Sequence, residues 1–182
     1  MNALIWALSG YMFLYCGFVI VKFLLNSASL FLIRNKRLVM SLNRKKMNLE
    51  WKGNFRFEVK NEKGLTVKFD APAKYGGEET SPSPMETLLA CLAGCTSYDV
   101  MSILRKKRQN ISGYWVEAEA ERAEEPPEVF TKISIKYIVK GKNVSKDAVE
   151  RSIQLSMEKY CSVGAMLKKT AEIQTSYEII QE

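Results

Sequence analysis

The residues that could carry chemistry in this 182-residue chain are its cysteines, because it has four of them and no histidine. Without an imidazole there can be no Ser-His-Asp or Cys-His nucleophile, no H-E-x-x-H zinc site and no histidine pH switch. Cys91 and Cys95 are spaced i and i+4 in ACLAGCTS, so on a helix they share about the same face. Core packing is the ordinary role of such thiols, and they supply too few ligands for a tetrahedral zinc site.

Cys161 has a different sequence context, between the end of one predicted helix and the start of a further helical turn. Its sulfur is therefore expected near backbone N–H groups of that turn, an arrangement that favours a thiolate. Placed next to a thiol of the preceding long helix, Cys161 would complete a peroxidatic and resolving pair.

The helix that carries Cys91 and Cys95 has the clearest start signal in the chain. Ser83 suits the N-cap, Pro84 the first helical position, and Glu86 completes a capping box with Ser83. Apolar residues with helical spacing predict a long, mostly buried helix over about 84–108. Small residues in its middle would let another element approach closely.

The remaining pattern consists of strands interrupted by helices. FRFEVK and GLTVKFD predict one hairpin, and YWVEAEAER and FTKISIKYIVKG a second, longer one. A helix near 146–159 capped by Ser145, a helical turn at 163–169 and a final strand, EIQTSYEII, follow. The order ββ-α-ββ-α-α-β predicts an α+β fold in which an antiparallel sheet packs on a long central helix.

The net charge of +7 comes from one end of the chain. Residues 1–46 hold seven basic residues and no acidic one, whereas residues 47–182 are formally neutral. Residues 47–182 have no excess of positive charge with which to bind phosphate backbones, so we expect no nucleic-acid partner.

The basic end also contains an apolar run. Residues 3–21 carry no charge and are long enough to cross a bilayer as a helix, and the positive charges that follow would leave the body in the cytoplasm. Alternatively, Met40 or Met47 is the true start. Both interpretations divide the chain into an extension, 1–46, which would give the only membrane contact, and one domain, 47–182.

Two segments resemble a known superfamily: SPSPMETLLACLAGCTSYDVMSIL, and MEKYCSVGAML further along the chain. They are similar to the osmotically inducible protein C and organic hydroperoxide resistance proteins (OsmC/Ohr), most closely to the OsmC-like branch. The resemblance covers essentially all of 47–182. It implies an OsmC-like fold and an intertwined homodimer with two equivalent sites at the interface.

The resemblance also implies roles for two cysteines. The reactive cysteine of the family matches Cys95, within GCT, and its partner matches Cys161, within KYC. Cys95 would attack a peroxide, preferably an organic hydroperoxide in apolar surroundings, and Cys161 would then form a disulfide that a cellular dithiol reduces. No metal or organic cofactor is required.

One departure concerns the groups that activate the thiolate. Well-studied peroxidases of the superfamily use an arginine before the long helix and a glutamate near its start. Glu86 matches the glutamate, with either a catalytic or a capping role, but none of Arg56, Lys68, Lys74 and Arg122 matches the arginine. Without a close cation we expect a weakly ionised thiol. A non-catalytic redox-sensing or small-molecule-binding dimer, or a purely structural one, therefore remains an alternative.

Overall fold

The computed structural model describes residues 44–182, so all but the last three residues of the predicted extension 1–46 lie outside the described residues. The described chain divides into two compact parts. One comprises the residues up to Glu50 together with Val59–Val67, and the other comprises Trp51–Glu58 together with Lys68–Glu182.

The first strands form a three-stranded sheet in the order β1-β2-β3. They are β1 (Met47–Trp51), β2 (Phe57–Asn61) and β3 (Thr66–Phe69). The predicted first hairpin is confirmed as β2 and β3, and its turn is closed by Asn61, whose side chain accepts hydrogen bonds from the N–H groups of Lys63 and Leu65 at 2.9 and 3.0 Å. The sequence analysis did not predict β1, in which every residue is exposed, so no buried face marked it.

The long helix is α2 (Pro84–Lys106), preceded by a short 3-10 helix, η1 (Ala73–Tyr75). Its capping box is confirmed: the Glu86 N–H donates to Ser83 Oγ at 3.3 Å, and the Ser83 N–H donates to the Glu86 carboxylate at 2.7 Å. Within residues 44–182, α2 is the one helix long and apolar enough to cross a membrane, a test that core helices of soluble proteins also pass.

The second sheet has the order β4-β5-β6. Its strands are β4 (Asn110–Arg122), β5 (Phe130–Lys142) and β6 (Glu172–Gln181). The long hairpin of β4 and β5 is antiparallel as predicted, but β6 runs parallel to β5, so the expectation of a purely antiparallel sheet is wrong. The cause is the helical connection between β5 and β6, which is long enough to return the chain in the same direction.

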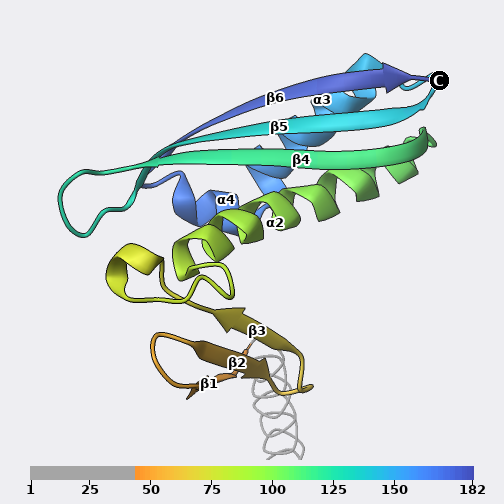
Figure 1. The fold of residues 1–182 in the computed structure, drawn as a ribbon. Helices are drawn as coiled ribbons and strands as arrows, with labels where there is room; N and C mark the ends of the chain where they lie inside the picture. Colours follow the sequence, from red (N-terminus) through yellow and green to blue (C-terminus); the bar gives the residue numbers. More distant parts are fainter. Residues whose placement is uncertain (1–43) are drawn as a thin grey trace, which may run out of the picture. The chain divides into compact units, whose positions relative to one another are not determined.

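One face of the second sheet is covered by the helices, as Figure 1 shows. Along β5 the covered face presents the buried side chains of Ile133, Ile135, Tyr137 and Val139. The opposite face carries ion pairs, among them Lys136 with Glu178 at 2.7 Å. This alternation confirms the predicted α+β class with a central helix.

The predicted helix over 146–159 consists of two pieces. Ser145 caps α3 (Lys146–Leu155), and a π-helical turn, η2 (Ser156–Tyr160), follows it directly. The helix changes from α to π at this point because the Cys161 N–H donates to the carbonyl of Ser156, five residues earlier rather than four, at 2.8 Å. A short helix, α4 (Ser162–Leu167), then leads to β6. Single π-helical turns are frequent at functional sites.

Candidate redox site

The structure brings together two thiols that are far apart in the sequence. Cys95 lies in the middle of α2 and is half-buried, whereas Cys161 follows η2 and is 3% exposed. Cys95 packs against the hydrophobic core that includes Cys161, and it raises the pKa of the Cys161 thiol. Both cysteines are free thiols here.

Cys161 sits at the N-cap of α4, and its sulfur accepts a hydrogen bond from the Gly164 N–H at 3.2 Å. A Cβ atom at position 164 would lie 3.4 Å from Cys161 Sγ, so the backbone of Gly164 packs closely against this sulfur. The expectation that this sulfur lies near an N–H group of the following turn is therefore confirmed.

The consequence expected for the thiolate is nevertheless wrong. Burial raises the pKa of Cys161 to about 11, and the hydrogen bond from Gly164, which lowers the pKa, does not compensate. Interactions with Cys95 and with the Asp99 carboxylate raise it further. Cys161 is thus held as a thiol at neutral pH.

Asp99 ties α2 to the turn that presents Cys161. It lies one helical turn after Cys95, and its carboxylate accepts a hydrogen bond from Ser156 Oγ at 2.9 Å. The carbonyl of the same Ser156 accepts the Cys161 N–H. Neither residue was predicted from the sequence, although the i+4 spacing places Asp99 on the same face as Cys95.

Three hydroxyl groups lie beside the thiols. Thr96, next to Cys95, donates to the Ala93 carbonyl at 3.1 Å, and Tyr114 donates to Ser97 Oγ at 3.2 Å. Tyr137 is fully buried, and its hydroxyl has no hydrogen-bond partner of ordinary geometry among the described residues. Burial raises the pKa of both tyrosines to about 12.

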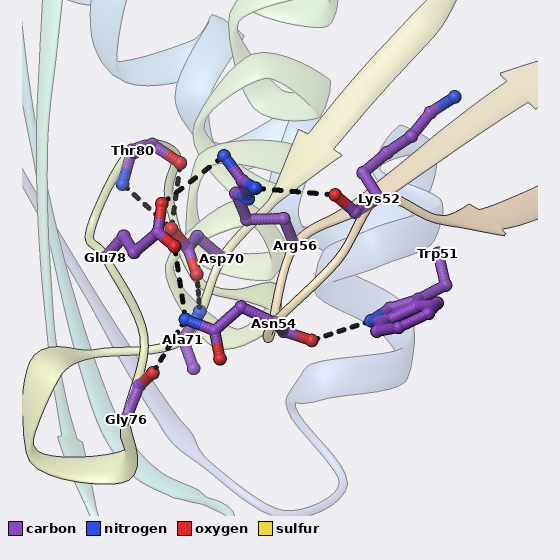
Figure 2. A network of polar contacts seen from close by, with 9 residues as sticks. All are labelled: Trp51, Lys52, Asn54, Arg56, Asp70, Ala71, Gly76, Glu78 and Thr80. Atoms are coloured by element: carbon purple, nitrogen blue, oxygen red, sulfur yellow. Dashed lines mark hydrogen bonds and ion pairs between the residues drawn. The ribbon is translucent and has the colours of Figure 1, made fainter.

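Arg56 and Arg122, the two arginines weighed in the sequence, each pair with a glutamate. Figure 2 shows Arg56 directed at Glu78, with a shortest N–O distance of 3.3 Å, and at the Lys52 carbonyl at 3.5 Å. Arg122 pairs with Glu128 at 3.1 Å. Among residues 44–182, the carboxylate of Asp99 is a charged group that raises the pKa of the Cys161 thiol.

The loop before α2 is organised by the buried carboxylate of Asp70, also seen in Figure 2. It accepts hydrogen bonds from the Thr80 N–H and hydroxyl at 3.0 and 2.8 Å and from the Ala71 N–H at 2.8 Å. These bonds, the Thr80 N–H first, lower the pKa of Asp70. The carboxylate thus fixes the segment that leads into the capping box.

Glu86 serves the capping box in this chain. Hydrogen bonds from the Ser83 side chain and backbone lower its pKa. At 1.5 Å per residue it lies about 13 Å along α2 from Cys95, so the two side chains of one chain do not meet.

A groove borders the redox pair on the neighbouring face of α2. It has a volume of about 740 Å³ and is lined by residues of α2 and by one residue of β4. Its lining includes Gly94, Tyr98, Met101, Arg105 and Tyr114.

Cys91 is exposed, and residues 44–182 contain no group of three or more His, Cys, Asp or Glu side chains that could hold a metal ion.

Residues 76–176 match the family described as OsmC-like protein. This chain belongs to the OsmC-like family. Protein YhfA of Escherichia coli K12 is 45% identical over 102 residues, which are 56% of this chain and 76% of YhfA.

Two solved structures illustrate the range of similarity. A hypothetical protein from Aquifex aeolicus VF5 is 33% identical with a TM-score of 0.68, over 77% of this chain and 98% of that one. The organic hydroperoxide resistance protein OsmC of Legionella pneumophila is 14% identical with a TM-score of 0.59, over 75% and 98%, and supports the fold alone. Family membership and the thiol pair together support a redox-related role for this OsmC-like protein.

Proposed function

We propose that this OsmC-like protein is a thiol-dependent peroxidase that reduces organic hydroperoxides through Cys95 and Cys161. The observation that carries the proposal is the packing of a half-buried thiol on α2 against the core that holds a buried thiol at the start of α4. Two neighbouring thiols, one within reach of solvent and the other protected, suit a peroxidatic and a resolving cysteine.

The difference in burial assigns the roles. Cys95, as a thiolate, attacks the oxygen of the hydroperoxide that carries the hydrogen; the O–O bond breaks, Cys95 becomes a sulfenic acid and the alkoxide leaves as an alcohol after taking up a proton. Cys161 then loses its proton and attacks the Cys95 sulfur, forming a disulfide and releasing hydroxide, which takes up a proton to give water. A cellular dithiol reduces the disulfide and restores both thiols.

The substrate preference follows from the surroundings of the pair. Cys161 belongs to the hydrophobic core, and Leu92, Val100 and Ile135 of that core are all but completely buried. Transfer of an alkyl or aryl substituent from water into such surroundings is favourable, whereas hydrogen peroxide has no apolar group to bury. The name of the Legionella relative, an organic hydroperoxide resistance protein, is consistent with this preference.

We further propose that the protein is a cytoplasmic homodimer in which Glu86 supports the site. Glu86 supports the site by holding the start of α2, and any direct role in catalysis would involve a site formed with a second copy. The exposed side of α2 is available to such a copy, as an intertwined dimer would require. A reducing compartment would supply the dithiol and keep the cysteines free.

Redox sensing without efficient turnover is the second candidate function. The observation that favours it is the Asp99 carboxylate, which raises the pKa of the Cys161 thiol and so disfavours its thiolate. A sensor would form the same disulfide with about one equivalent of peroxide and then stop.

The test compares cumene hydroperoxide with hydrogen peroxide in the presence of a dithiol. We expect faster consumption of the organic peroxide by the wild-type protein and none by Cys95→Ser. When the dithiol is left out, we expect a sulfenic acid at Cys95 without a Cys95–Cys161 disulfide in Cys161→Ser. Cys91→Ser is the matched control, because this exposed cysteine of the same helix has no assigned role. Retained turnover in Cys95→Ser would contradict the proposal, and a single turnover in the wild type would favour the sensor.

A further inference from the structure

The buried side chain of Ser156 forms its hydrogen bond with another helix. It is 0% exposed, at the point where α3 passes into η2, and its hydroxyl donates to the Asp99 carboxylate of α2 at 2.9 Å. Ser152, one turn earlier and equally buried, donates instead to the Val149 carbonyl of its own helix at 2.7 Å. A local bond of that kind is open to any helical serine, so the bond to Asp99 calls for an explanation.

The carbonyl of Ser156 holds the π-helical turn that precedes Cys161. It accepts the Cys161 N–H at 2.8 Å, whereas in a continued α-helix that N–H would donate to the carbonyl of Met157, four residues earlier. Successive residues of a helix differ in direction by about 100°, so exchanging one carbonyl for the other would turn the Cys161 side chain away from its present direction. Because π-helical turns are rare, this one needs contacts that hold it.

Asp99 connects this turn to the helix that carries the other thiol. It lies four residues after Cys95 on the same face of α2, and Cys95 packs against the core that includes Cys161. The carboxylate is unfavourable for the Cys161 thiolate, because it raises the pKa of that thiol. Its contact with Ser156, rather than activation of the thiol, therefore accounts for its place beside the pair.

We propose, building on the proposed peroxidase, that Asp99 and Ser156 are positioning residues for the resolving step: the hydrogen bond between them holds η2 as a π-helical turn and so keeps the Cys161 sulfur where it can attack Cys95. Neither residue touches the peroxide or exchanges a proton. The bond raises the effective concentration of Cys161 at the Cys95 sulfur, which favours the disulfide at equilibrium as well as its formation.

Equilibrium with glutathione measures this effect without peroxide. In a Cys16→Ser, Cys91→Ser background, alkylation and intact mass give the ratio of Cys95–Cys161 disulfide to dithiol in glutathione buffers at pH 7. We expect Ser156→Ala to lower the equilibrium constant for disulfide formation about tenfold, which is a rise of about 30 mV in reduction potential. Ser152→Ala is the matched control, because it removes an equally buried hydroxyl whose bond stays within α3, and it should leave the potential unchanged.

Two substitutions of Asp99 separate position from charge. Asp99→Asn keeps an oxygen that can accept from Ser156 and should leave the potential unchanged, whereas Asp99→Ala removes the bond and should raise the potential about as much as Ser156→Ala. The lost charge does not affect the potential at pH 7, because Cys161, with a pKa of about 11, is protonated there. Combining Ser156→Ala with Asp99→Ala should add nothing to either alone, as for two groups that act through one bond. If Ser156→Ala does not fold, the two Asp99 variants carry the test.

An unchanged potential in either Ser156→Ala or Asp99→Ala would overturn the inference. An equal rise in Ser152→Ala would also overturn it, by assigning the hydroxyl to folding, as would a background protein that forms no Cys95–Cys161 disulfide. Because no peroxide is used, a protein that shows the expected potentials but consumes no hydroperoxide would contradict the peroxidase alone.

Discussion

At Cys161, two opposing effects act on one sulfur. The Gly164 N–H stabilises the thiolate, and burial destabilises it, with burial the larger effect. The result is a thiol that ionises late and is poorly suited to attack peroxide, next to a half-buried thiol that is accessible. Different surroundings thus distinguish two chemically identical side chains, as the two roles in the proposed reaction require.

Replacing Asp99 by Asn tests the electrostatic part of this environment. The amide oxygen of Asn can still accept the hydrogen bond from Ser156, but the charge that raises the pKa of Cys161 is gone. The pKa of Cys161 should therefore fall, and the attack of Cys161 on oxidised Cys95 should become several-fold faster near neutral pH, with its pH profile moved to lower pH. Stopped alkylation followed by intact mass measures this rate.

Asp99→Ala serves as the comparison, because it removes the charge and the hydrogen bond together and so releases the turn that carries Cys161. A pH profile in Asp99→Asn identical to that of the wild type would show that the carboxylate does not act on this thiol.

Among the elements, α2 and η2 do most to place the site. The capping box starts α2 at a defined residue and so sets the position of Cys95 along the helix. The π-helical turn adds one residue to the last turn before Cys161 and directs its N–H to the Ser156 carbonyl. Neither thiol would reach the other if either element were shifted by one residue, because the side-chain direction on a helix changes by about 100° per residue.

The capping box predicts two different outcomes for its two residues. Ser83→Ala removes the N-cap oxygen and should lower the free energy of unfolding by about 1 kcal/mol. Glu86→Gln preserves both hydrogen bonds, so its unfolding free energy should stay close to that of the wild type. Urea denaturation measures both.

The same Glu86→Gln variant separates the two roles of this residue. If Glu86 acts through the cap, hydroperoxide consumption should remain within about twofold of the wild type. A loss of tenfold or more, with stability unchanged, would instead assign its carboxylate to the reaction.

On the scale of the whole molecule, α2 is too apolar for the exposure it has within one chain. Only 22% of its most apolar 18-residue window is buried, and Tyr98 in its middle is 83% exposed. An apolar helix of this kind is stable in water when a second surface covers it. A second copy of the chain is the occupant that the proposed homodimer supplies.

Replacing Tyr98 by Glu should therefore weaken the dimer and convert it to a monomer at micromolar concentration, measured by sedimentation velocity. Trp115→Glu is the control, since Trp115 is also an exposed aromatic residue but lies on β4. A monomeric wild type, or equal effects of both substitutions, would contradict a dimer formed through α2.

The sequence by itself determined the local elements. Ser83, Pro84 and Glu86 predicted the start of α2, the alternation of apolar residues predicted the long hairpin, and Ser145 predicted the cap of α3, because these signals act over a few residues. The family motifs around Cys95 and Cys161 identified the pair itself.

Only the tertiary structure decided how β6 pairs, where the π-helical turn falls and what surrounds the thiols. Parallel pairing depends on a long crossover, and the hydrogen bond of Asp99 to Ser156, whose carbonyl accepts the Cys161 N–H, depends on the packing of α2 against the turn before α4. No local pattern encodes such contacts. The ionisation of Cys161 was misjudged from sequence for the same reason: the hydrogen bond from Gly164 is local, whereas burial is a property of the folded molecule.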